Sequence, residues 1–413
     1  MGIATLVGRS ELKHRELSEA VSTHVSTYQR QRWARPVLRG AAVDGNAAAE
    51  AQKALNGFKR LSEPEREGLA SVVHYGRALT PEQSALLDAQ AYRINSLRGA
   101  ASRAWAVTTL DPEEPLNPPP PDYGRFIDAM LVVLADASRL PADACLPAAC
   151  DAVRLGQDVV PGAPLEAASI SMRVTSLAAP VIARCTRGAS YAALLSAARE
   201  LHLMASNPPP TFGGIELADL AMLVRLRELS TVWPPQSGES PVKRLHQRPI
   251  LLEAFKHFDK PARWRAISPT NYPQALTSWL EEQEWRDRSD LPLVREASSE
   301  VTGFLFDDMR GQAELRVLTV GLATLAERAN RERLPREPIN LKDQALVDPF
   351  NGRPLLWRVA TDGGELTIWS VGEDRRDDKG VSEWTPQAPV DVAVHFSLAV
   401  PQLAKAPTKK AIR

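Results

Sequence analysis

The residues best suited to chemistry lie in one short loop near the C-terminal end of the chain. This loop, Ser370–Gly380, carries four carboxylates between two glycines: Glu373, Asp374, Asp377 and Asp378. Hard cations such as Ca²⁺ take several oxygen ligands from one flexible loop. The loop is therefore a candidate Ca²⁺ site, with the three aspartates Asp374, Asp377 and Asp378 as ligands. The alternative is a charged hairpin turn, because three basic residues offset most of the negative charge: Arg375, Arg376 and Lys379.

No known catalytic motif accompanies this loop. The sequence contains no phosphate loop, no G-x-G-x-x-G, no H-E-x-x-H and no G-x-S-x-G. The seven histidines are scattered, and no two are four residues apart. The sequence therefore predicts no catalytic and no cofactor-binding residue. A hydrolase with a site in a helical groove stays as the alternative, since the members of a Ser-His-Asp triad need not be neighbours in sequence.

The three cysteines, Cys145, Cys150 and Cys185, are too few for a disulfide-based scaffold. The first two are separated by four residues, and no second pair of ligands completes a zinc site. Two interpretations remain. The cysteines are small buried helix residues, or Cys145 and Cys150 form a local disulfide, which would require an oxidising compartment.

Composition narrows the class of protein. The 413 residues include 50 basic and 50 acidic side chains, with 44% hydrophobic and 24% charged residues, which is ordinary for a soluble globular chain. A formal net charge of zero argues against a protein that binds nucleic acid or an anionic membrane, since binding to either favours an excess of basic residues. No apolar run reaches the ~18 residues of a membrane-spanning helix.

Helical patterns dominate the first three hundred residues. Two N-terminal capping signals, Ser62-Glu-Pro-Glu65 and Thr80-Pro-Glu-Gln83, each open a helix, and the second helix is expected to run to about residue 107. The proline-rich stretch 111–122 reads as an extended connector. The remaining helices are expected at 10–33, 123–138, 142–158, 163–185, 189–205, 217–229, 242–258 and 271–285.

The pattern changes towards the C-terminal end. A long helix is expected over 293–332, with interruptions at Gly303 and Gly311. Its apolar stripe has helical spacing and consists of Leu315, Leu318, Leu322, Leu325 and Ala329. Two short apolar runs, 354–360 and 365–371, flank an Asp-Gly turn and predict a β-hairpin. Alternation over 390–398 predicts a third strand.

This C-terminal part resembles the major pseudopilins of type II secretion over residues 312–385. The resemblance rests on Asp348-Pro-Phe-Asn-Gly, on Asp362-Gly-Gly and on Thr367-Ile-Trp-Ser-Val-Gly-Glu-Asp374. It implies a long helix packed across an antiparallel sheet, followed by a calcium loop. In the turn, Pro349 would fix φ, Gly352 would supply a left-handed residue and Phe350 would fill the helix–sheet core. The chain departs from the family in lacking its N-terminal prepilin-peptidase site and in carrying Arg375 where the calcium loop has glycine.

The rest of the chain is similar to a group of bacterial envelope proteins, common in myxobacteria and planctomycetes, with no assigned activity. Three segments carry this resemblance: Arg35–Gly40, Gly45-Asn46 and Asp151–Asp158. It implies a periplasmic or envelope protein that is anchored at its N-terminus by a membrane segment preceding this sequence and that binds another envelope protein. A cytoplasmic protein is the alternative location, and an accessory component of a secretion or pilus-like system is an alternative role.

Together these patterns predict a mainly α fold, in which a multi-helical array made of helices alone is followed by a small α+β module. In that module a long helix packs on three to four antiparallel strands. The expected domains are a helical block at 1–111, a second helical body at 112–292 and the module at 293–403. A disordered tail is expected at 404–413. The expected function is that of a non-enzymatic scaffold or binding body carrying a pseudopilin-like module.

Overall fold

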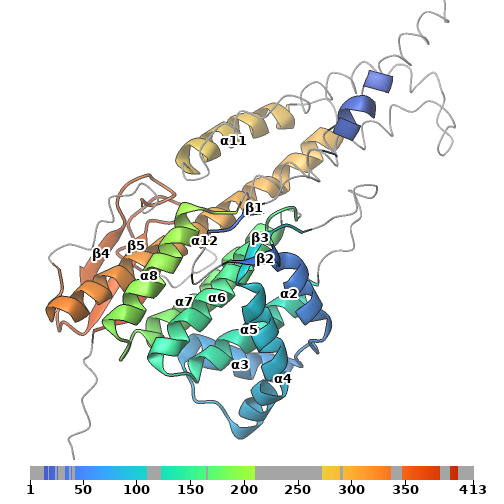
Figure 1. Cartoon of the computed structure of the whole chain (residues 1–413). Coiled ribbons are helices and arrows are strands. Elements are labelled where there is room, and N and C mark those ends of the chain that lie inside the picture. The colour runs from blue at the N-terminus through green and yellow to red at the C-terminus, as the bar shows by residue number, and fades with distance from the viewer. Residues whose placement is uncertain are drawn as a thin grey trace, which may run out of the picture.

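The computed structural model confirms a mainly α fold with a small α+β module (Figure 1). The structure describes residues 14–16, 18–23, 26, 33–36, 39, 42–108, 122–163, 166–209, 272–288, 292–335, 347–381 and 391–398. The helices expected at 217–229 and 242–258 and the tail expected at 404–413 lie outside these residues. Within the described residues, no helix is both long enough and apolar enough to cross a lipid bilayer.

The N-terminal block contains the helices α2 (Ala47–Asn56), α3 (Glu63–Tyr75) and α4 (Pro81–Ala100). Both predicted capping signals are confirmed. The backbone N–H of Ser62 donates to Glu65 Oε2 at 2.7 Å. At the start of α4, Gln83 N donates to Thr80 Oγ1 at 3.2 Å, and Thr80 N donates to Gln83 Oε1 at 2.9 Å. These bonds satisfy N–H groups that the first helical turn leaves without partners.

The expectation of a body made of helices alone is wrong, because three short strands form a sheet beside α2. They are β1 (Trp33–Ala34), β2 (Val43–Asn46) and β3 (Arg103–Ala106), and β3 pairs with β1 antiparallel and with β2 parallel. The helix expected to reach residue 107 stops at Ala100. Ser102 closes it, since its hydroxyl donates to Gly99 O at 2.7 Å, and β3 follows. Similarly, Trp33, the last residue of the helix expected over 10–33, belongs to strand β1.

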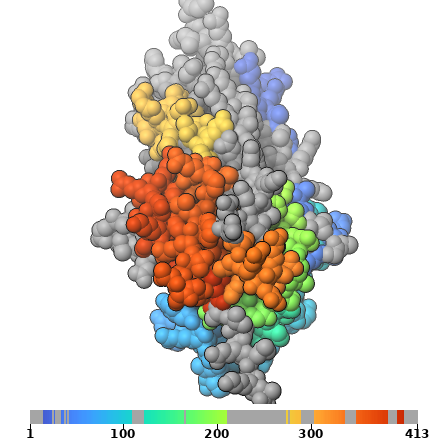
Figure 2. Space-filling model, turned by 90° about the vertical axis from the view of Figure 1, so that its left-hand side faces the viewer, coloured from blue at the N-terminus to red at the C-terminus, as the bar shows by residue number. Residues whose placement is uncertain are grey.

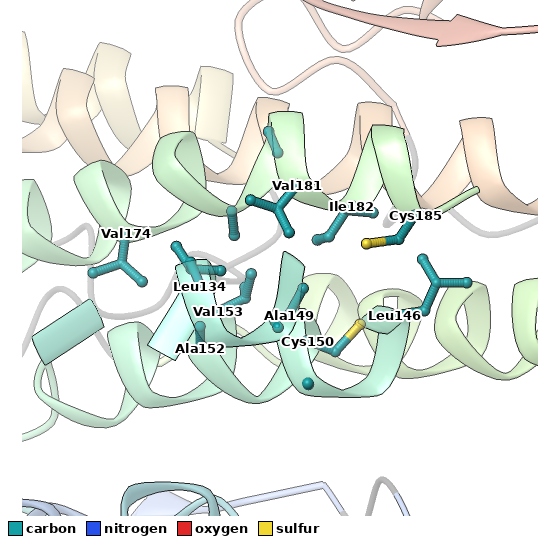
Figure 3. Packing of buried hydrophobic residues seen from close by; sticks show 14 of the residues in the cluster. Leu134, Leu146, Ala149, Cys150, Ala152, Val153, Val174, Val181, Ile182 and Cys185 are labelled. Carbon is teal, nitrogen blue, oxygen red and sulfur yellow. The ribbon is translucent and has the colours of Figure 1, made fainter. Parts of the chain in front are cut away.

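Four helices form the centre of the molecule. They are α5 (Tyr123–Ser138), α6 (Ala142–Asp158), α7 (Glu166–Cys185) and α8 (Tyr191–Ser206), and all four predicted helices are confirmed to within three residues. Figure 3 shows Leu134 of α5, Val153 of α6 and Val181 of α7 converging on one buried layer. Gly156 lets α6 approach α7 closely, because a Cβ atom there would lie 2.9 Å from Val174 Cβ.

The long helix is confirmed as α12 (Pro292–Arg331), preceded by α11 (Tyr272–Asp287). Neither Gly303 nor Gly311 interrupts it. Gly311 instead permits close packing against α7, since a Cβ atom there would lie 3.2 Å from Met172 Cα. The four leucines of the predicted stripe are buried, whereas Ala329 is exposed near the end of the helix.

The C-terminal sheet has three antiparallel strands in the order β4–β5–β6, namely β4 (Leu356–Val359), β5 (Glu365–Ser370) and β6 (Val392–Ser397). The predicted hairpin closes where Ala360 N donates to Glu365 O at 2.9 Å. Helix α12 packs on β5 and β6 and also on α7 and α8 (Figure 1). In the space-filling view, α12 and the strands form one contiguous block on this face, with α11 beside it (Figure 2).

One hydrophobic cluster runs from the N-terminal helices to the C-terminal strands. It contains Leu69 of α3, Val153 of α6, Leu318 of α12 and Phe396 of β6, all of them buried. Helix α12 therefore belongs to both the helical body and the module. The domain boundaries at 112 and 293 remain predictions.

Candidate functional site

The Asp348-Pro-Phe turn connects the sheet to α12. Asp348 is buried, and its carboxylate accepts three hydrogen bonds at 2.9 Å each, from Phe350 N, Ser370 Oγ and Val371 N. Arg316 of α12, also buried, donates from Nη1 to Val347 O at 2.6 Å. A single carboxylate therefore fixes the end of β5 against the turn, while the arginine fixes the turn against α12.

The expected roles of two other turn residues are confirmed. Gly352 has a φ of +71°, in the left-handed region that glycine adopts without steric cost. Phe350 is 1% exposed and lies in a second hydrophobic cluster with Trp279 of α11 and Met309 of α12. The turn thus brings α11, α12 and the sheet together around one aromatic ring.

The acidic loop after β5 is shaped by its own hydrogen bonds. Asp374 Oδ1 accepts from Arg376 N at 2.9 Å. Asp377 Oδ1 accepts from Lys379 N at 2.9 Å and from the indole Nε1 of Trp369 at 3.0 Å. Two of the three predicted Ca²⁺ ligands therefore make local bonds that close the loop.

Asp391, which precedes β6, is a residue that the sequence reasoning missed. Alternation places it on the polar face of the strand, yet it is 1% exposed. Its Oδ2 accepts from Gly380 N at 2.7 Å, and Oδ1 has no hydrogen-bond partner among the described residues. Burial, together with the nearby carboxylates of Asp378 and Asp377, raises the pKa of Asp391 to about 6. The carboxylate accepting from Gly380 links the acidic loop to the third strand.

The positions of these carboxylates bear on the predicted calcium site. Among the residues that the structure describes, no three His, Cys, Asp or Glu side chains form a group able to hold a metal ion. Asp374 and Asp377 are accounted for by the loop hydrogen bonds. The assignment of Ca²⁺ to Asp374, Asp377 and Asp378 stays a prediction.

Calcium binding can be tested on the folded protein. Because backbone and indole N–H groups donate to Asp374 and Asp377, we expect the melting temperature to stay within a degree when Ca²⁺ or a chelator is added. Ca²⁺ present at one hundred times its Kd would stabilise the fold by about 2.7 kcal/mol. A rise of several degrees that disappears in Asp378→Asn but not in the control Asp362→Asn would contradict our expectation and establish the site.

One histidine does lie near a hydroxyl and a carboxylate. His395 Nδ1 is 3.2 Å from Thr367 Oγ1 and 3.0 Å from Glu365 Oε1, across strands β5 and β6. In a catalytic triad the hydroxyl and the carboxylate contact opposite ring nitrogens. Here both contact the same nitrogen, so these three residues form a cross-strand polar contact rather than a proton relay.

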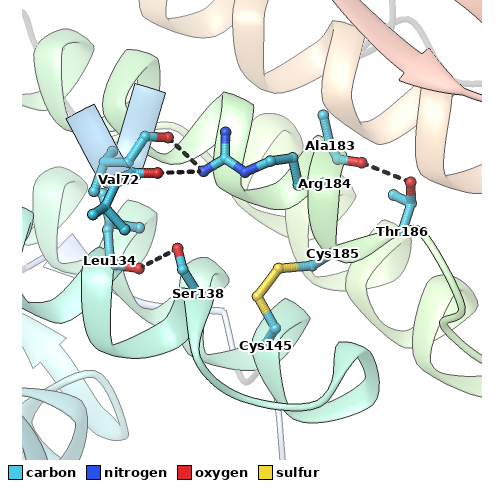
Figure 4. The surroundings of a disulfide bond; sticks show 9 residues. Val72, Leu134, Ser138, Cys145, Ala183, Arg184, Cys185 and Thr186 are labelled. Carbon is cyan, nitrogen blue, oxygen red and sulfur yellow. Dashed lines mark hydrogen bonds between the residues drawn. A yellow bond between two sulfur atoms is a disulfide. The ribbon is translucent and has the colours of Figure 1, made fainter. Parts of the chain in front are cut away.

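The cysteine pairing differs from the one considered from the sequence. Cys145 of α6 forms a disulfide with Cys185 of α7 (Figure 4), and Cys150 is free and buried. Cys145 and Cys150 lie on one helix about 140° apart around its axis, because each residue turns it by about 100°. The Cα atoms of Cys145 and Cys185 lie 5.9 Å apart, within the usual disulfide range of about 4.4–6.8 Å.

The residue next to the disulfide extends the connection to the N-terminal block. Arg184 donates to the carbonyl oxygen of Val72 at 3.2 Å (Figure 4) and to that of His74 at 3.1 Å, both at the end of α3. Carbonyl groups in the last turn of a helix need acceptor partners beyond the regular helical hydrogen bonds, and Arg184 supplies donors there in addition to Gly76 N, which donates to Val72 O at 3.0 Å. The disulfide region therefore joins α3, α6 and α7.

Comparison with known proteins found no matching family model, no matching curated protein and no matching solved structure.

Proposed function

We propose that this chain is a non-enzymatic protein of the bacterial cell envelope, in which a helical binding body carries a pseudopilin-like module. The body faces an oxidising compartment and binds a protein partner there. The module holds the chain's C-terminal part in one fixed arrangement on that body.

The observation that carries this proposal is the disulfide between Cys145 and Cys185. Disulfides persist in the periplasm and at cell surfaces and are rare in the reducing cytosol. This one joins two central helices across a separation of 40 residues. In the chain-entropy treatment such a bond stabilises a fold by about 4 kcal/mol. The helical body is therefore more stable in an oxidising compartment, where the disulfide persists.

The C-terminal module supports the second part of the proposal. A long helix crosses a three-stranded antiparallel sheet, and the Asp348-Pro-Phe turn joins them through Phe350 and Gly352. These are the features that the pseudopilin resemblance implied for residues 312–385. The module is built from packed apolar residues, which favours a structural role for it.

The proposal is tested by trapping thiols in the bacterium that encodes the protein. Cells are quenched with acid, denatured and treated with a maleimide reagent that adds mass to each free cysteine. We expect one modified cysteine before reduction and three after it, with the protein in the periplasmic or envelope fraction. In Cys145→Ser both remaining cysteines should react without reduction, whereas in Cys150→Ala none should.

Three reactive cysteines before reduction, together with recovery in the cytosolic fraction, would contradict the proposal. Recovery in the envelope fraction with a protein partner after mild cross-linking would support the binding role as well as the location.

A further inference from the structure

A cavity of about 210 Å³ lies where the end of α4, the segment after β1 and helix α6 meet. Its charged lining consists of five arginines and one carboxylate: Arg35, Arg39, Arg98, Arg103, Arg154 and Asp151. The uncharged lining residues have small side chains, and they include Pro36, Ala101 and Ser102. Cationic groups therefore dominate a concave surface on a chain whose net charge is zero.

Three segments build this cavity: the one after β1, the one from the end of α4 to the start of β3, and helix α6. Arg35 and Arg39 come from the first, and Asp151 and Arg154 come from α6, more than one hundred residues later. These two segments carried the resemblance to envelope proteins. Arg35 joins the three segments, since its backbone N donates to Ala104 O of β3 at 3.2 Å and its Nη2 donates to Asp158 Oδ2 of α6 at 2.7 Å.

Both terminal nitrogens of Arg35 are committed to the protein itself, whereas its Nε has no hydrogen-bond partner among the described residues. Its Nη2 donates to Asp158 Oδ2 at 2.7 Å and to Ala101 O at 3.0 Å, and its Nη1 donates to Arg103 O. The Arg35–Asp158 pair is almost completely removed from solvent. Arg35 thus serves as a support that shapes the cavity and holds the loop after β1.

Arg154 is a buried side chain with two donor nitrogens to spare. It is 2% exposed, and its Nη2 donates to Pro36 O at 2.8 Å. Its Nε and Nη1 have no hydrogen-bond acceptor within the described part of the chain. The Oδ1 atom of Asp158 lies 3.9 Å from Arg154 Nε, beyond hydrogen-bond distance. A buried guanidinium with unused donors is costly unless something accepts from them.

The other three arginines are partly exposed. Arg103 Nη1 donates to Asp44 O at 3.1 Å, and its Nε has no acceptor among the described residues. Arg98 pairs with Asp136 at 2.8 Å. Arg39 contacts Asp151 and also Glu200, the latter at 3.2 Å. A ligand could therefore reach the cavity past these side chains and meet Arg154 within it.

Nearby carboxylates offset much of this charge at neutral pH, including Asp136 beside Arg98 and Glu50, whose Oε2 is 3.9 Å from Arg103 Nη2; binding of an anion here therefore depends on the unused donors and not on net charge. Burial raises the pKa of Asp151 and of Asp158 to about 6, and that of Glu200 to about 7. Burial lowers the pKa of Arg154 to about 10, so Arg154 stays protonated at neutral pH.

We propose that this cavity binds a phosphate group, with the free donors of Arg154 and Arg103 as its principal partners. Guanidinium groups suit the oxygens of phosphate, which they bind through paired N–H donors. The volume is below the about 300–1,000 Å³ typical of pockets for drug-sized ligands, so a small oxyanion or the phosphate end of a small molecule fits. This inference does not depend on the envelope location.

Binding is measured by calorimetry on the full chain, with inorganic phosphate and phenyl phosphate as probes and chloride used to hold ionic strength constant. We expect saturable binding, weakened at least tenfold in Arg154→Gln and several-fold in Arg103→Gln. Arg60→Gln is the matched control, because Arg60 pairs with Asp122 on the surface outside the cavity, and it should bind as the original chain does.

Should Arg154→Gln fail to fold, the more exposed Arg103→Gln carries the test. Tighter binding of inorganic phosphate than of phenyl phosphate would identify a free anion as the ligand. The reverse order would identify a phosphate monoester, and both support the proposal. Absence of saturable binding, or equal affinity in Arg103→Gln and Arg60→Gln, would overturn it.

Discussion

Replacing Asp348 with alanine is expected to lower the free energy of unfolding by about 3–5 kcal/mol, since each buried donor left without a partner costs about 1–3 kcal/mol. The carboxylate accepts from Phe350 N, Ser370 Oγ and Val371 N. Ser370 is 0% exposed and Val371 is 4% exposed, so water cannot readily replace the lost acceptor. The loss would be measured as a shift in the urea midpoint with an unchanged slope.

Asp362→Ala is the matched control. Asp362 also accepts a backbone hydrogen bond, from Gly364 N at 2.8 Å, but it lies in the exposed turn of the hairpin. Surface substitutions of this kind change stability by about 0.5 kcal/mol. If Asp348→Ala were no more destabilising than Asp362→Ala, the account of Asp348 as the link between turn and sheet would be wrong.

Replacing Gly321 with alanine is expected to destabilise the protein by about 1–3 kcal/mol, the usual cost of overpacking a core. A Cβ atom at Gly321 would lie 2.2 Å from two ring carbons of Phe396. Phe396 is completely buried in the main cluster, so its rigid ring has no solvent-facing space into which to move. Helix α12 can approach β6 this closely only where it carries no side chain.

Gly303 supplies the opposite case on the same helix. No atom lies within 4 Å of a Cβ built there, so Gly303→Ala should stabilise the helix by up to about 1 kcal/mol through helix propensity. The two substitutions are chemically identical, and their effects on the urea midpoint should have opposite signs. Stabilisation by both would show that α12 does not lie against Phe396.

Local signals in the sequence were sufficient to predict most of the helices. The capping residues Ser62 and Thr80 fix helix starts through bonds to residues three positions later, which a sequence shows directly. The hairpin and the alternation over β6 are equally local, because one strand of an antiparallel pair follows the other after a short turn. The Asp348-Pro-Phe turn was predictable for the same reason.

Long-range pairing is what the sequence did not reveal. Strand β1 has two residues and β3 has four, too few for alternation to show, and they pair across about seventy positions. The arginine cavity depends on that pairing. The sequence analysis singled out the segments Arg35–Gly40 and Asp151–Asp158 without placing them near each other, and it did not single out Arg98 or Arg103. Asp391 was assigned to a polar face because the alternation of residues along β6 does not show that the acidic loop contacts Asp391 through Gly380 N. The Cys145–Cys185 bond depends on how α6 packs on α7.

The central claim is that α12 is covered by the helical body on one side and by the small sheet on another. The direct measurement is the sedimentation and urea unfolding of a chain shortened to residues 1–339, which keeps α12 and removes the turn and all three strands of the module. We expect self-association and a markedly lower unfolding midpoint, because the surface around Gly321 would be exposed to water. A monodisperse shortened chain that unfolds at the midpoint of the full protein would contradict the claim.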